Sequence, residues 1–211
     1  MTANSFVKEL SNLKLDNVFN PYSDRCDIYD LYDAPQKRRA LLKKILEATN
    51  SVEVDSLWVG RDLGYRGGRR TGLALTDEKH IFQHAEKWGI EAGKFTKGEI
   101  VVERTATVIW DLLSQIDVPV FLWNVFPFHP YQPENPFSNR AHNVKERLLG
   151  EELLSLLIHY LKPKKIIAIG NDAEQVAVKM FDSNRVIKVR HPSYGGQKEF
   201  VTQIHKIYHL G

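Results

Sequence analysis

Apolar positions along this 211-residue chain follow two spacings. Short runs rich in β-branched and aromatic residues predict strands, and these runs cover residues 57–59, 118–123, 165–169 and 186–189. Elsewhere apolar residues recur with the period of a helix; these patterns cover residues 39–48, 76–88, 106–116, 144–161, 171–181 and 198–210. Strands that alternate with helices predict parallel strands joined by right-handed crossovers. The expected fold is therefore an α/β, three-layer α/β/α sandwich around a four-stranded parallel sheet.

Length and charge limit the possibilities only a little further. A chain of 211 residues fits one domain with a sizeable core, so we expect a single domain over residues 1–211. Residues 1–34 match no part of the sheet pattern, and we interpret them as an N-terminal extension or covering segment. The formal net charge of +3 permits an acidic partner such as nucleic acid but does not require one.

Cys26 is the single cysteine of the chain. It excludes an intramolecular disulfide, a cysteine-ligated zinc site and a four-cysteine iron–sulfur cluster, and it favours a reducing compartment. The opening residues lack the apolar core of a signal peptide, and no apolar run is long enough to span a bilayer. We therefore expect a cytoplasmic, monomeric protein with no membrane partner.

In parallel sheets of this kind, ligands bind beyond the carboxyl ends of the strands. The first such end opens into the loop 60–72, which holds five glycines and four arginines. It matches neither the dinucleotide-binding fingerprint nor a phosphate-binding P-loop. Two interpretations of this loop stay open. It is a solvated surface loop, or its backbone approaches an anionic polymer that Arg66, Arg69 and Arg70 attract.

The second strand end opens at Asn124 into a long loop that runs to Arg140. Prolines stiffen this loop, aromatic residues interleave with polar ones, and Arg140 is a further candidate for contact with DNA. The Asn124 amide offers both donors and an acceptor, as is needed to bind the edge of a nucleobase. The competing interpretation is that Asn124 only caps the end of the sheet by bonding to backbone.

Asp62, Asn124 and His191 each lie at or near the carboxyl end of a predicted strand, so a parallel sheet would bring them to one pocket. A carboxylate would stabilise a sugar that becomes positively charged and would orient water. An imidazole would donate to a departing base anion, and an amide would select the base. The set of three predicts cleavage of an N-glycosidic bond.

Four short motifs resemble the uracil-DNA glycosylase superfamily, and the likeness covers residue 57 to the C-terminus. The motifs read Gly60-Arg61-Asp62, Thr71-Gly72-Leu73-Ala74-Leu75, Val120-Phe121-Leu122-Trp123-Asn124 and His191-Pro192-Ser193. Their order and their positions at strand ends also agree with the family. The resemblance implies a four-stranded parallel sheet, a base that is flipped out of DNA into a pocket, and neither a metal nor an organic cofactor. The iron–sulfur branches do not fit the cysteine count.

The resemblance also implies roles for single residues. It makes Asp62 the carboxylate that orients water and stabilises the cation, and His191 the donor to the leaving base. It makes Asn124 the reader of the base edge, and Ser193 a contact to a DNA phosphate beside the flipped nucleotide.

Departures from the family pattern lie around the same pocket. Gly60 and Gly64 would line it, and Gly64 stands where the family has a tyrosine that blocks the thymine methyl group. Leu75 replaces the aromatic residue that stacks on uracil, which leaves Phe126 as the candidate for stacking. Tyr194, followed by two glycines, stands where the family has a leucine that wedges into the duplex. We assign Tyr194 to contact with DNA.

The function that the sequence predicts is a monofunctional DNA glycosylase for uracil or a related damaged base in single- or double-stranded DNA. The alternative is a nucleic-acid- or nucleotide-binding module of the same fold without the chemistry. A metal site is the third possibility, because His80/His84 and His205/His209 have helical spacing. Neither pair has the adjoining glutamate of zinc proteases, so we expect helix-face histidines and no metal.

Overall fold

A computed structural model describes all residues, 1–211. Its helices are α1 (Ala3–Asn12), α2 (Ala34–Ala48), α3 (Gly68–Thr71), α4 (Ile81–Glu86), α5 (Arg104–Leu113), α6 (Val144–Leu161), α7 (Asn171–Met180) and α8 (Gln197–Tyr208). Its strands are β1 (Val18–Phe19), β2 (Ser56–Asp62), β3 (Val120–Phe126), β4 (His129–Pro130), β5 (Lys165–Ile169) and β6 (Val186–Val189). Two short 3₁₀ turns, Thr49–Ser51 and Ser183–Arg185, complete the elements. None of the helices combines the length and apolar composition that a bilayer crossing requires.

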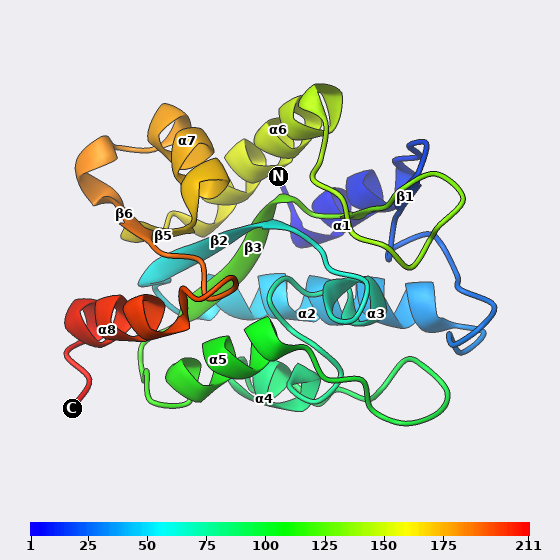
Figure 1. The fold of residues 1–211 in the computed structure, drawn as a ribbon, viewed down its shortest axis with the longest axis horizontal. Helices are drawn as coiled ribbons and strands as arrows, with labels where there is room; N and C mark the ends of the chain where they lie inside the picture. The colour runs from blue at the N-terminus through cyan, green and yellow to red at the C-terminus, as the bar shows by residue number, and fades with distance from the viewer.

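The main sheet has four strands in the order β3-β2-β5-β6, and every neighbouring pair is parallel. Helices α6 and α7 cover one face while α5 and α8 cover the other, as Figure 1 shows. The three-layer α/β/α fold with a four-stranded parallel sheet is confirmed. A separate two-stranded antiparallel pair, β1 with β4, lies beside it.

The two apolar layers follow from the alternation of side chains along a strand. In β2, Leu57 and Val59 point into the larger core, which they share with α1, α2, α6 and α7. Trp58 points the other way, into the core beneath α5 and α8, where Phe200 meets it edge to face at 6.2 Å. Because both faces are buried, the strand is apolar at successive positions, as is typical of parallel sheets.

The N-terminal segment lies against the sheet and the first loop. Helix α1 begins with a capping box between Thr2 and Ser5, and its Phe6 packs against Trp123 of β3 at 5.7 Å. The Tyr22 hydroxyl donates to the carbonyl of Gly72 at 2.7 Å. Residues 1–34 therefore contribute to the core and fix one end of the loop that follows β2.

Element boundaries differ from the sequence prediction most clearly at β2, β3, α4 and α2. Strands β2 and β3 continue to Asp62 and Phe126, which are paired in register, so the first strand ends after Asp62 and not before it. Helix α4 is shorter than the pattern 76–88 because Asp77 accepts backbone hydrogen bonds from Lys79 and His80 and closes a turn instead. Helix α2 begins earlier, at Ala34, with a proline in its first turn.

Candidate active site

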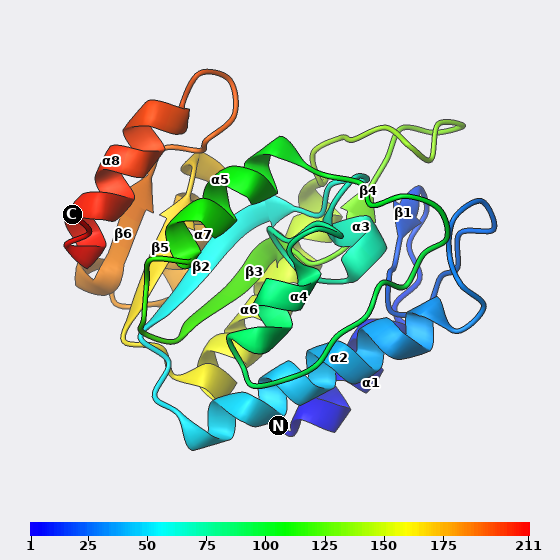
Figure 2. The same ribbon diagram turned by 90° about the horizontal axis from the view of Figure 1, so that it is seen from below.

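A cleft of about 440 Å³ opens beyond the carboxyl ends of the parallel strands. The chain segments that form it are the loop after β2, the start of α5, the loop before α6 and the turns after β5 and β6. In Figure 2 the loop between β6 and α8 and the start of α5 lie along the same upper edge of the molecule. Seven of the predicted site residues line the cleft: Asp62, Gly64, Leu75, Arg140, His191, Ser193 and Tyr194.

Asp62 ends strand β2 and presents its carboxylate to this cleft. The side chain is 7% exposed, and both of its oxygens are held. Oδ1 accepts from Nδ1 of His142 at 2.5 Å, and Oδ2 accepts from Nε of Arg61 at 2.9 Å. Two donors on opposite oxygens fix the plane of the carboxylate, so it does not need to reorient when a positive charge develops beside it.

His191 follows β6 in a turn that determines its tautomer. Its Nδ1 accepts the backbone N–H of Ser193 at 3.1 Å, and the Ser193 hydroxyl lies 2.7 Å from the same nitrogen. Since Nδ1 is an acceptor, the neutral ring carries its proton on Nε2. Burial, with the nearby positive charges of Arg61 and Arg190, lowers the pKa of His191. The ring is therefore a neutral N–H donor at physiological pH.

Asn124 does not line the cleft. The residue is 1% exposed, and neither the oxygen nor the nitrogen of its amide has a hydrogen-bond partner. Its Oδ1 lies 2.5 Å from where a Cβ of Gly60 would stand, and Leu75 Cδ2 lies 3.1 Å from the same point. Gly60 thus makes room for the amide and, contrary to the prediction, does not itself line the cleft. Leu75 is the side chain that faces the cleft there. The competing capping interpretation does not hold, because the amide bonds to no backbone group.

A buried amide without partners costs stability. We expect Asn124→Leu to raise the free energy of unfolding by about 1–3 kcal/mol, because a side chain of similar volume removes two unpaired polar atoms. Denaturant unfolding measures the effect. A variant less stable than wild type would contradict the view that the Asn124 amide is buried without partners.

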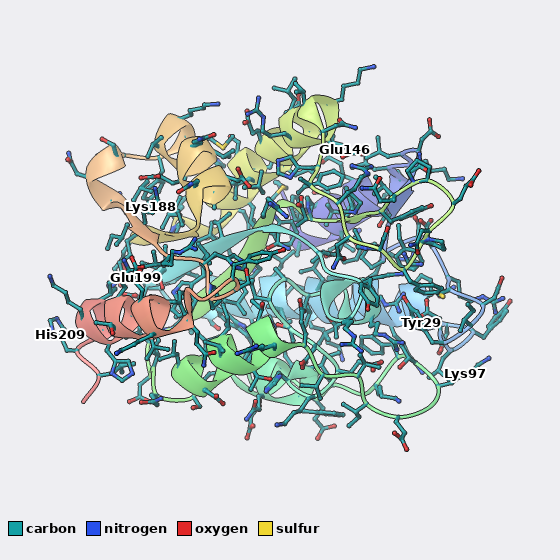
Figure 3. All side chains as sticks on the ribbon, in the orientation of Figure 1. Tyr29, Lys97, Glu146, Lys188, Glu199 and His209 are labelled. Carbon is teal, nitrogen blue, oxygen red and sulfur yellow. The ribbon has the colours of Figure 1, made fainter.

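Three predicted contact residues do not face the cleft: Arg69 and Phe126 are buried, Arg70 is half-buried against other residues, and the predicted roles are wrong. Arg69 is 3% exposed, and its guanidinium binds the Tyr29 hydroxyl and the carbonyl of Pro136. Arg70 lies over the Tyr29 ring at 3.9 Å and pairs with Glu78. Phe126 is fully buried in the main core, so it cannot stack on a base in the cleft. Figure 3 shows Tyr29 at the end of the molecule away from α8.

The other predicted DNA contacts lie at or near the surface of the cleft region, and some of them already have partners within the chain. Arg66 is exposed and makes no hydrogen bond or ion pair within the chain. Arg140 lines the cleft, but both terminal nitrogens bond to Glu146 at 2.7 Å, at the start of α6 as labelled in Figure 3. The Ser193 hydroxyl is occupied by His191. Tyr194 is 98% exposed, with a left-handed backbone at φ 51°.

Of the two histidine pairs, His80/His84 has partners of its own, whereas His205 is half-buried and His209 is exposed. His80 is held by Asp77 at 2.6 Å and His84 by the Thr76 hydroxyl at 2.9 Å, and both rings lie against Trp110. His80 and His84 are buried, not partly exposed on a helix face as expected. No group of three or more histidine, cysteine, aspartate or glutamate side chains is arranged to hold a metal ion.

Four residues of the cleft region were missed by the sequence analysis. Arg61 and Arg190 are exposed and line the cleft, and their positions beside Asp62 and His191 were the available signal. His142 and Glu103 lie far along the chain from the strand ends they approach. No spacing or motif in the sequence indicates them.

No protein-family model matches the sequence, and no curated protein matches it either. A solved structure does. The crystal structure of wild-type SMUG2 from Pedobacter heparinus aligns with a TM-score of 0.62, over 99% of this chain and 97% of that chain, at 14% sequence identity. The chain has the fold of SMUG2.

The likeness to SMUG2 spans the whole chain, including the N-terminal segment that the sequence resemblance left out. At this level of identity it establishes the fold and does not transfer single residues. The chemistry must therefore be argued from the cleft of this chain.

Proposed function

We propose that this protein is a monofunctional DNA glycosylase that hydrolyses the N-glycosidic bond of uracil or a related damaged base flipped out of DNA. One observation supports it above the others: a fixed carboxylate, Asp62, and a neutral imidazole donor, His191, line the same cleft. The structural likeness to SMUG2, a member of the uracil-DNA glycosylase family, agrees with the proposal at the level of the fold.

The reaction follows from the two groups. As the bond between C1′ and the base nitrogen breaks, its electron pair leaves with the base, and the sugar becomes an oxocarbenium-like cation. The Asp62 carboxylate stabilises that cation and accepts a proton from the water whose oxygen bonds to C1′. The Nε2–H of His191 donates to the base anion, which takes up a proton after release. The products are the free base and an abasic sugar, and the reaction as written uses no cofactor.

DNA would reach the cleft along an exposed basic rim. Arg61, Arg66 and Arg190 are exposed, and Arg61 and Arg190 also line the cleft, so a phosphate backbone would be attracted to this side of the molecule. An exposed aromatic residue beside such a rim offers a surface for an unstacked base. Tyr194 is that residue, at the tip of the loop that carries His191.

A lesion panel tests the proposal. Wild-type protein is incubated with labelled single- and double-stranded oligonucleotides that carry uracil, hypoxanthine, xanthine or 5-hydroxymethyluracil. At least one lesion should yield an abasic site that alkali then cleaves. If DNA is bound and no lesion yields an abasic site, the protein is instead a binding module of the same fold. The proposal includes action as a monomer in the cytoplasm, which gel filtration and localisation of the tagged protein check.

Tyr194 gives a second expected result. Tyr194→Ala should slow base release from double-stranded DNA about tenfold and leave release from single-stranded DNA within about twofold, because stacking only compensates for a base pair that must open. The matched control is Tyr32→Ala, which removes a tyrosine that is 85% exposed elsewhere on the surface. Equal losses on both substrates, or an equal effect of the control, would exclude this role.

A further inference from the structure

Glu103 is a polar group of the cleft that the proposed chemistry does not use. It stands at the amino end of α5, yet its side chain makes no capping hydrogen bond. Its backbone N–H is fixed by Asp77 Oδ2 at 2.6 Å. The carboxyl oxygens, in contrast, have no hydrogen-bond or ion-pair partner within the chain, and the residue lines the cleft.

Two glycines create the space for this carboxyl group. A Cβ at Gly67 would stand 2.1 Å from Glu103 Oε2, and a Cβ at Gly64 would stand 3.0 Å from Oε1. A side chain at Gly67 therefore cannot coexist with Glu103 as it lies. Gly64 also lines the cleft together with Asp62. The carboxyl group thus occupies part of the space that Gly64 leaves open.

The geometry points to Glu103 as a specificity-determining residue, whose carboxyl group binds the edge of the flipped base. This rests on the proposed function and names its substrate class: lactam bases, in which a ring N–H adjoins a carbonyl, as in uracil and hypoxanthine. A protonated carboxyl group presents one donor and one acceptor side by side and can form two hydrogen bonds with such an edge. In this structure Glu103 faces the cleft with that capacity, whereas the Asn124 amide lies buried behind Leu75.

The protonation of Glu103 makes the inference testable by pH. Burial, reinforced by the negative charge of Asp77 and opposed by Arg66, raises the pKa of Glu103 to about 7. Asp77 and Arg66 are the charged groups that act on the pKa of this carboxyl group. The other titratable residues of the cleft are Arg61, Asp62, Arg140, Asp172, Arg190, His191 and Tyr194.

The direction of the pH effect on activity follows from whether the Glu103 carboxyl group can donate a hydrogen bond. Below about pH 7 the carboxyl group is protonated and donates, so binding of a lactam edge is complete. Above that pH it becomes a carboxylate, which loses the donor and repels the base carbonyl. Wild-type activity on uracil and hypoxanthine should therefore fall as pH rises through about 7, approaching a tenfold loss per unit.

The decisive experiment compares Glu103→Gln, Glu103→Ala and wild type over pH 5.5 to about 9 in single-turnover assays with both lesions. Glutamine keeps a donor and an acceptor at every pH, so E103Q should lose the alkaline decline and stay within a few-fold of the wild-type rate at low pH. E103A should also lose the decline, and its rate should be about 10- to 100-fold lower at low pH. Glu152→Gln, on the exposed face of α6, is the matched control and should behave as wild type.

Failure of this inference is distinct from failure of the proposed function. If wild type forms abasic sites but E103Q and E103A keep its pH profile and rates, Glu103 does not bind the base. If wild type forms no abasic site at all, the proposed function fails. The inference is then judged by titrating free uracil into ¹³C-glutamate-labelled protein. A shift of the Glu103 carboxyl resonance, absent with E103Q, supports it, and an unchanged resonance overturns it.

Discussion

Replacing Asp62 with alanine is expected to slow base release about 10³-fold and to leave DNA binding within a few-fold of wild type. The carboxylate faces a charge that exists only in the transition state, so its loss raises the barrier without weakening the bound ground state. Its two fixed donors, His142 and Arg61, show that its orientation is set in advance. Single-turnover rates and a filter-binding assay separate the two effects.

The control for this variant is Asp111→Ala, which removes an exposed aspartate on α5 and should change neither measurement. His142→Phe adds a test of positioning. It keeps a ring against Phe126, which lies 6.2 Å away, but removes the donor to Asp62. We expect a loss of about tenfold in rate with unchanged DNA affinity. An Asp62→Ala protein that retains most of its activity would remove the carboxylate from the mechanism.

The second large effect concerns stability. Arg38→Met is expected to lower the free energy of unfolding by about 3–5 kcal/mol, because it leaves the Asp30 carboxylate buried without its partner. Both side chains are fully buried and form an ion pair with two contacts. Arg38 also donates to the carbonyl of Arg70 at 2.8 Å and packs against Gly72. The pair therefore anchors the N-terminal segment to the loop that follows β2.

A neighbouring pair provides the comparison. Lys37 and Asp33 form an ion pair at 3.1 Å, and their side chains are 47% and 48% exposed. Lys37→Met should change the free energy of unfolding by less than about 1 kcal/mol. The double variant Arg38→Met with Asp30→Leu should recover much of the loss, since it removes both charges. Urea denaturation measures all three, and an Arg38→Met protein as stable as wild type would contradict the buried-pair account.

The fold was predictable because its apolar pattern is strong. β-branched runs such as 165–169 and 186–189 coincide with β5 and β6. In β5, burial on both faces leaves little choice of residue. The ends of β2 and β3 were not predictable in the same way. Gly60 and Asn124 are poor strand formers, and they are kept in the ladder by pairing with each other across the sheet.

The candidate site was predictable only where residues sit at strand ends. Topology alone brings Asp62 and His191 to one edge of the sheet. Arg69, in contrast, looked like a DNA contact by composition, but the fold turns it inward against Tyr29. His142 and Glu103 reach the cleft from loops whose paths are set by tertiary packing, and nothing local in the sequence indicates their direction.

In the proposed function, Asp62 and His191 act on one glycosidic bond. The most direct test is a crystal structure of the wild-type protein with DNA that carries a non-hydrolysable 2′-fluoro analogue of deoxyuridine. We predict that C1′ lies beside the Asp62 carboxylate, and that Nε2 of His191 is within about 2.6–3.2 Å of a base oxygen. A base that stays stacked in the duplex, or one bound outside the cleft, would contradict the account.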